Sequence, residues 1–282
     1  MKRLRHLLPA VFAAATSFAA APNADWSPNL TTVTAWHWNI SNGGAVWDRI
    51  GTLQLGADVL SSSEYQIGRY DSVHPSLHFG GDWFPRFKAL NRGIGGARLD
   101  WQHRFGDSPR ATLFTLEGEV DAVYPVESAR RGTLTAINVR LAQRFGRTWR
   151  AAVTQRFEDF AAKGAVFDRR STETIAEIAR DFGSLTRVTL TGRWREGDVV
   201  TYAQFRRPDL QAVAHTMARL DTFRLPMTAY ATEARTIAGR IAVVHATAED
   251  TAVSLSYEYS MSSKGDLKFQ NPVLALSYVI QY

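Results

Sequence analysis

The chain has 282 residues, 45% of them hydrophobic and 11% aromatic, with a formal net charge of +6. This length allows one large domain, and the absence of cysteine excludes both a disulfide framework and a lipid-modified cysteine anchor. The sequence has no basic run interleaved with aromatic residues, so we expect no nucleic acid partner.

The N-terminus has the features of a secretory signal peptide. Lys2, Arg3 and Arg5 give a basic start, residues 7–18 form a short apolar run, and small residues follow at 19–21. The alternative is an N-terminal membrane anchor, but the apolar run is shorter than the roughly 20 residues that a spanning helix needs. We therefore expect a signal peptide at 1–21, cut within a few residues of its end, and a short lead at 22–29.

From residue 30 to residue 282 the sequence breaks into segments that mostly alternate between apolar and polar positions. In 111–124, for example, Phe114 and Leu116 fall on one face while Glu117 and Glu119 fall on the other. Segments of about ten residues with a period of two are typical of tilted membrane strands. The sequence predicts an all-β, antiparallel, up-and-down transmembrane β-barrel of about twelve strands. The predicted strands lie at 30–40, 47–59, 74–84, 93–105, 111–124, 132–145, 148–160, 171–182, 187–196, 235–246, 251–260 and 271–282.

The connections between these segments alternate between short and long. Arg-Phe-Gly at 104–106 and 144–146 and Asp-Phe-Gly at 181–183 each end a strand, and a new strand follows within about five residues. Short turns on one side and long loops on the other are typical of outer-membrane barrels, whose short turns face the periplasm. The expected long connections are 84–92, 125–131, 161–170, 197–234 and 261–271.

The segment 197–234 is the longest of these connections. Pro208 begins a stretch whose apolar residues fit a short amphipathic helix with proline in its first turn. Such a helix either folds into the barrel mouth or lies across the rim. If 198–205 and 225–234 pair as a further hairpin, the barrel has fourteen strands instead of twelve.

The last predicted strand has an apolar or aromatic residue at every second position. Ala275, Ser277 and Gln281 separate these positions, so the two faces differ. This pattern resembles the C-terminal strand of bacterial outer-membrane β-barrel proteins. The resemblance implies that the strand closes the barrel and is read by the barrel-assembly machinery. The implied assembly signal consists of Leu274, Leu276, Tyr278, Ile280 and Tyr282.

The polar faces of the strands are rich in arginine and carboxylates and poor in lysine, while the apolar faces carry bulky aromatic residues. A soluble β-sandwich, the alternative fold, would expose lysine, serine and asparagine to water. Guanidinium and carboxylate groups that face each other are expected where charges pair in a confined space. The predicted lumen residues are Arg98, Arg104, Arg140, Arg144, Arg150, Arg156, Arg193, Arg195, Glu117, Glu119 and Asp121.

The inward charges allow two interpretations. A balanced set of ion pairs across the strand ladder is expected of an occluded barrel that serves as a structural anchor for a partner. Tracks of arginine along a solute pathway would instead make a small passive channel for anionic or polar solutes. In the second case the chain resembles, in architecture and lumen chemistry, the twelve-stranded arginine-lined channels for acidic oligosaccharides.

A third interpretation is an outer-membrane lipid hydrolase. His74 and Ser76 have the H-x-S spacing of such enzymes, in which a histidine activates a serine on the same strand face. Two departures weaken the match: Leu77 replaces the expected asparagine, and the predicted register turns the pair toward the lumen instead of the lipid. We therefore expect no enzyme activity.

The sequence indicates no metal site and no cofactor. His37, His78 and His103 fall on different predicted strands, and no phosphate-binding loop or zinc-binding spacing is present. Three glycines, Gly93, Gly95 and Gly96, are interpreted as relieving crowding or bending the sheet.

The expected surroundings follow from the predicted barrel. They are the lipid of the bacterial outer membrane, the barrel-assembly machinery and a small anionic solute.

Overall fold

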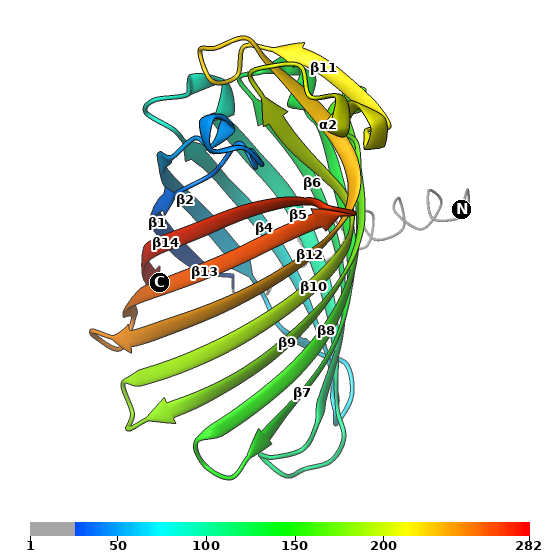
Figure 1. Cartoon of the computed structure of the whole chain (residues 1–282). Coiled ribbons are helices and arrows are strands. Elements are labelled where there is room, and N and C mark those ends of the chain that lie inside the picture. The colour runs from blue at the N-terminus through cyan, green and yellow to red at the C-terminus, as the bar shows by residue number, and fades with distance from the viewer. Residues whose placement is uncertain (1–25) are drawn as a thin grey trace.

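The structure, a computed structural model, describes residues 26–282 and shows an antiparallel β-barrel (Figure 1). Within this range twelve strands pair in a closed ring, because β1 pairs with both β2 and β14 and β10 pairs with both β9 and β12. The predicted signal peptide at 1–21 lies outside the described residues. The barrel strands are β1 (Ser27–His37), β2 (Thr52–Ser62), β4 (Asp71–Trp83), β5 (Arg92–Arg104), β6 (Leu113–Pro125), β7 (Gly132–Phe145), β8 (Trp149–Ala162), β9 (Arg169–Phe182), β10 (Thr186–Ala203), β12 (Met227–Ala246), β13 (Thr251–Lys264) and β14 (Leu267–Gln281).

The predicted barrel of twelve strands is confirmed, and each predicted strand overlaps one observed strand. The alternative of fourteen barrel strands is wrong. Residues 198–203 do pair with 228–233, but these residues continue β10 and β12 beyond the rest of the barrel instead of adding new strands. The long connection predicted at 261–271 is also absent, because β13 and β14 continue until only residues 265–266 separate them.

Three short turns lie at one end of the barrel, here called the turn end, whereas the two-residue turn between β13 and β14 lies at the other end. Residues 146–148 join β7 to β8, and 183–185 join β9 to β10. Gly146 and Gly183 both have a φ of +67°, a conformation that glycine adopts without steric cost. This is why the Phe-Gly pairs in the sequence mark the turns. Both ends of the described chain lie at the turn end, since β1 leaves it and β14 returns to it.

The two longest connections, at 38–51 and 204–226, lie at the opposite end, here called the loop end, together with the connection at 84–91 (Figure 1). The β10–β12 connection contains the predicted helix, α2 (Pro208–Val213), and β11 (Thr216–Leu220), which pairs with the far end of β12. The remaining small elements are β3 (Tyr65–Gln66) at the turn end and four short 3-10 helices at the loop end. These 3-10 helices are η2 (Val46–Asp48), η3 (Lys88–Leu90), η4 (Ser128–Arg130) and η5 (Ala165–Phe167).

A buried apolar cluster, the apolar cap, lies at the loop end. It joins the β4–β5 connection to the β10–β12 connection, and Phe223 packs edge-on against both Phe87 and Tyr202 at centroid distances of 5.2 and 5.0 Å. In ring order β4 and β5 occupy the third and fourth places and β10 and β12 the ninth and tenth, so the two connections start from opposite sides of the barrel. The cap therefore crosses the mouth. Its members are Phe84, Phe87, Leu90, Val166, Phe167, Tyr202, Phe223, Met227, Ala229 and Ala231.

The outer face of the barrel is apolar around its circumference. Large hydrophobic side chains remain exposed on successive strands, which water does not tolerate over such an area but lipid does. No helix within residues 26–282 is long and apolar enough to span a membrane. The exposed aromatic residues include Trp36, Trp83, Trp101, Trp149, Trp194, Tyr257 and Tyr278.

The closing strand β14 follows the same alternation. Leu274, Leu276 and Tyr278 are exposed on the outer face, and the strand pairs along its length with both β1 and β13. The part of the sequence prediction that concerns barrel closure is confirmed. Recognition of this strand by the assembly machinery stays a prediction.

We expect Leu276→Arg to destabilise the barrel. Leu276 lies near the middle of β14 on the outer face, where a buried guanidinium in hydrocarbon costs about 2–4 kcal/mol. Urea unfolding in phospholipid vesicles measures the change. Gln281→Arg, which adds the same group at the turn-end rim, serves as the control and leaves the free energy of unfolding nearly unchanged. Equal losses in the two variants would contradict the assignment of the outer face to lipid.

Candidate functional site

The barrel encloses a cavity of about 590 Å³ beneath the apolar cap, here called the upper cavity. Residues of nearly every barrel strand line it, which identifies the inward face of each strand. Phe84, Leu90 and Phe167 of the cap form part of its wall. Its arginines are Arg92, Arg130, Arg169, Arg193 and Arg195.

A second cavity, the lower cavity, lies toward the turn end and has a volume of about 500 Å³. Its charged lining is strongly unbalanced, because Glu177 is the only carboxylate among the described residues that line it. Its arginines are Arg104, Arg140, Arg144, Arg150 and Arg187.

The two cavities contain most of the predicted lumen arginines. Arg193, Arg195 and the predicted Asp121 line the upper cavity. The remaining predicted residues, Arg98, Arg156, Glu117 and Glu119, lie on β5, β6 and β8 between the stretches that line the two cavities.

These intermediate residues form a buried ion-pair network. Glu119 accepts hydrogen bonds from Arg98 at 2.9 Å and lies 3.0 Å from Arg156, which reaches over the intervening strand β7. Asn138 of β7 donates to Glu117 and accepts from Arg156. Because Glu119 is almost fully buried, its charge depends on these two arginines, since a buried carboxylate without partners is strongly unfavourable.

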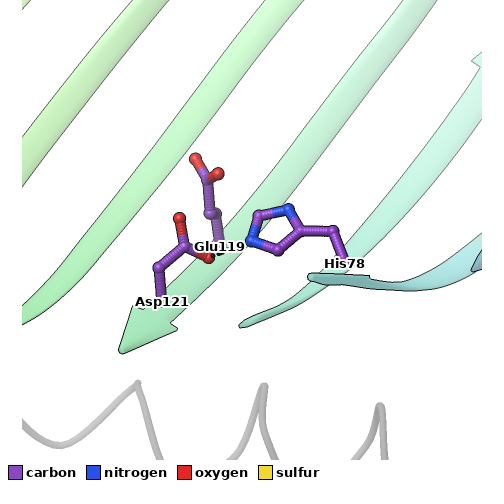
Figure 2. A group of neighbouring side chains, drawn as sticks. All are labelled: His78, Glu119 and Asp121. Atoms are coloured by element: carbon purple, nitrogen blue, oxygen red, sulfur yellow. Dashed lines mark ion pairs between the residues drawn. The ribbon is translucent and has the colours of Figure 1, made fainter. Parts of the chain in front are cut away.

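The same network includes a contact that spans two strand spacings. His78 of β4 and Asp121 of β6 both lie opposite Gly96 of β5, and His78 Nε2 is 3.0 Å from Asp121 Oδ1 (Figure 2). A side chain at Gly96 would occupy the space between them. The sequence analysis interpreted this glycine as relieving crowding, and the register shows which residues need the space.

His78, Glu119 and Asp121 bring one ligand atom each to within 4.8 Å of one another, and all three are buried (Figure 2). The sequence analysis did not join them, because His78 is distant in sequence and only strand register places it near β6. An imidazole and two carboxylates are metal-ligating groups. Here, however, both Glu119 oxygens already face arginines, so these residues are better described as part of the charge network.

The ion pairs nearer the turn end join both neighbouring strands and strands one position further apart. Arg140 of β7 lies 3.5 Å from Glu177 of β9, and Arg150 lies 3.0 Å from Asp181. Arg104 and Arg144 are exposed, and neither forms a salt bridge within residues 26–282. The lower cavity therefore has guanidinium groups that face the lumen without a carboxylate partner.

His74 and Ser76 do not form a catalytic pair. The hydrogen bond of His74 Nε2 joins Ser72 Oγ at 2.8 Å, and Ser76 is buried. Both residues face inward, as predicted, because Leu77 and Phe79 are exposed on the outer face of β4. The arrangement gives no nucleophile at the lipid surface.

Above the barrel, Arg130 fastens the β6–β7 connection to the apolar cap. Its guanidinium donates to Glu127 at 2.9 Å and to the hydroxyl of Tyr202, and Thr222 donates to the same carboxylate. Burial raises the pKa of Tyr202 to about 12, so this hydroxyl stays neutral at physiological pH. These hydrogen bonds thus join the β6–β7 connection to the two connections that cross the mouth.

Known structures with the same fold are outer-membrane barrels. The COG4313 outer membrane channel from Pseudomonas putida F1 is similar over 93% of this chain and 97% of its own, with a TM-score of 0.63 and 10% sequence identity. The NanC porin is similar over 90% of this chain and 100% of its own, with a TM-score of 0.50 and 8% identity. No family model and no curated protein matches the sequence. At these identities the likeness shows the fold, that of bacterial outer-membrane β-barrel proteins.

We expect Gly96→Ala to destabilise the protein by about 1–3 kcal/mol, the usual cost of overpacking. The added Cβ would collide with Asp121 Oδ1 and lie 2.6 Å from the main-chain oxygen of Val120. Urea unfolding in vesicles measures the loss. Gly192→Ala is the matched control, because a Cβ at Gly192 in β10 meets no heavy atom of the described residues within 4 Å. A loss as large in the control would show that the His78–Asp121 contact is not what requires glycine.

Proposed function

We propose that this chain is a passive channel of the bacterial outer membrane that conducts small anionic solutes. The observation that carries the proposal is the lower cavity, where five arginines and one carboxylate line the lumen. Fixed charges of one sign along a narrow pathway set the selectivity of a pore. The fold supports the same conclusion, because the solved structures that resemble this chain include an outer membrane channel and a porin.

The chemistry of arginine suits this role. A guanidinium stays charged at any physiological pH and presents several donors in a plane, which match carboxylate and phosphate oxygens. Arg104 and Arg144 are exposed and lack a carboxylate partner in the described chain, so an entering anion replaces water around them without breaking an ion pair. Arg140 forms a longer ion pair with Glu177, at 3.5 Å, and Arg150 forms a shorter one with Asp181, at 3.0 Å. Both guanidinium groups contribute to the positive electrostatic field of the lower cavity.

We expect anion selectivity to depend on Arg140 and Arg150. The double substitution Arg140→Glu with Arg150→Glu reverses two charges of the lower cavity, and a reversed field favours cations. Single-channel recording of the refolded protein across a salt gradient gives the reversal potential, which should change from an anion-selective to a cation-selective value. Arg219→Glu, on the exposed face of β11 outside both cavities, is the control. An unchanged reversal potential in the double variant would contradict the proposal.

The apolar cap favours a second candidate, an occluded barrel that acts as an anchor for a partner. The cap crosses the mouth and is fastened by Arg130, so the loop end is covered. In the channel interpretation this cap must yield for solute to enter. In the occluded interpretation it is a permanent seal.

We expect Phe223→Ala to increase open probability several-fold. Phe223 is 2% exposed and contacts Phe87 and Tyr202, so its loss leaves a cavity in the cap that costs about 3–5 kcal/mol of packing energy. Phe205→Ala is the control in the same connection, because Phe205 is 66% exposed. Planar-bilayer recording compares the two. If wild type and both variants are silent while heat-modifiable migration shows a folded barrel, the occluded interpretation holds.

A further inference from the structure

We propose that the upper cavity binds a small organic anion that has an apolar body. The proposal deepens the channel function and rests on it for the route by which the ligand enters. It stands on three observations: a carboxylate shared by two arginines of the cavity wall, guanidinium donors without acceptors and an aromatic wall.

The carboxylate of Glu158 is shared by three arginines. It lies 3.3 Å from Arg156, 3.9 Å from Arg169 and 4.0 Å from Arg195. Arg156 holds the shortest of these contacts, and the other two are at the limit of an ion pair. Arg169 and Arg195 therefore share a single distant negative charge, which leaves positive charge uncompensated in the cavity wall.

These two arginines also have donors without acceptors. Among the described residues, Nε of Arg169 and both Nε and Nη2 of Arg195 are buried atoms with no hydrogen-bond partner. A buried donor left unpaired costs free energy, and a charged donor costs more, so such groups are rare in folded proteins. Both side chains line the upper cavity and are partly exposed, at 34% for Arg169 and 26% for Arg195, so an acceptor that enters can reach their guanidinium groups.

The wall next to these donors is aromatic. The guanidinium of Arg169 lies 5.1 Å from the ring centre of Phe160, and Phe84, Phe167 and Tyr202 line the same cavity. Water forms few favourable interactions with such a wall. An apolar part of a ligand that covers the aromatic rings removes their surface from water, which is favourable. The cavity thus places cationic donors and aromatic rings within one enclosed volume.

The ligand chemistry follows from this combination. A planar carboxylate accepts two hydrogen bonds from a guanidinium in the geometry that arginine favours, and an aromatic or branched apolar body contacts Phe84, Phe160 and Phe167. The volume of about 590 Å³ is within the range of cavities that hold one small molecule. A bare inorganic anion would satisfy the donors but leave the aromatic wall uncovered.

Benzoate, acetate and benzamide test the two parts of this chemistry. Benzoate has both the carboxylate and the ring, acetate lacks the ring, and benzamide replaces the charged group by a neutral one of similar shape. Calorimetric titration of the refolded full chain in detergent should show saturable binding of benzoate and at least roughly tenfold weaker binding of acetate and benzamide. Acetate binding as tight as benzoate binding would overturn the role of the aromatic wall, and no saturable heat with benzoate would overturn the site.

Substitutions that are expected to change the affinity for benzoate in opposite directions identify the donors. Arg195→Gln and Arg169→Gln should each weaken benzoate binding about tenfold, because each removes a charge-assisted hydrogen bond. Glu158→Gln should strengthen it, since the competing carboxylate is lost. Arg219→Gln on β11 is the control and should leave affinity unchanged. Heat-modifiable migration verifies that each variant is folded. Equal affinity in all four variants would overturn the assignment.

This experiment separates the site from the channel. Binding is measured in detergent without a membrane, and conductance is measured independently in a bilayer. Conductance without benzoate binding would contradict the proposed ligand site but not the proposed channel. Benzoate binding by a barrel that never conducts would contradict the proposed channel but not the ligand site.

Discussion

The structure depends on closure of the backbone hydrogen-bond ladder between β1 and β14 and between β10 and β12. Lipid offers no partner for peptide groups, so a sheet can cross a membrane only as a ring without free edges. Closure also divides every strand into two faces. The outer face that contacts lipid must be mainly apolar, and most charged side chains of these strands face the interior.

Confinement explains the charge chemistry of the lumen. Charges on the inward face have little access to bulk water, so most are neutralised by carboxylates on neighbouring or next-neighbouring strands. Arg98, Arg156 and Glu119 satisfy one another in this way in the middle of the barrel. The compensation is incomplete at both cavities, where arginine exceeds carboxylate. Those excess guanidinium groups give the lumen a field and a set of donors for which the folded chain provides too few acceptors.

The loop end shows how strand length and sealing are related. β10 and β12 continue past the other strands and carry β11 and α2 with them, which brings Tyr202, Phe223 and Met227 over the mouth. There they meet Phe84 and Phe87 from the opposite side of the ring. A soluble-type apolar core thus forms on top of a membrane barrel. The side chains that stabilise the cap are therefore the same ones that cover the mouth. A cap that packs more tightly restricts the entry of solute.

The sequence by itself determined the number of barrel strands, their two faces and the short turns at 146–148 and 183–185, but not the two-residue turn at 265–266. A period of two and a Phe-Gly turn are local properties that need no knowledge of distant residues. The inward placement of Arg104, Arg140 and Arg195 followed from the same alternation. Only the tertiary structure decided that His78 meets Asp121 across Gly96, that Glu158 is shared by three arginines, and that the cap crosses the mouth. Apart from the Arg156–Glu158 pair within β8, these contacts join different strands or loops. They therefore depend on the register and curvature of the closed ring, which a period of two does not specify.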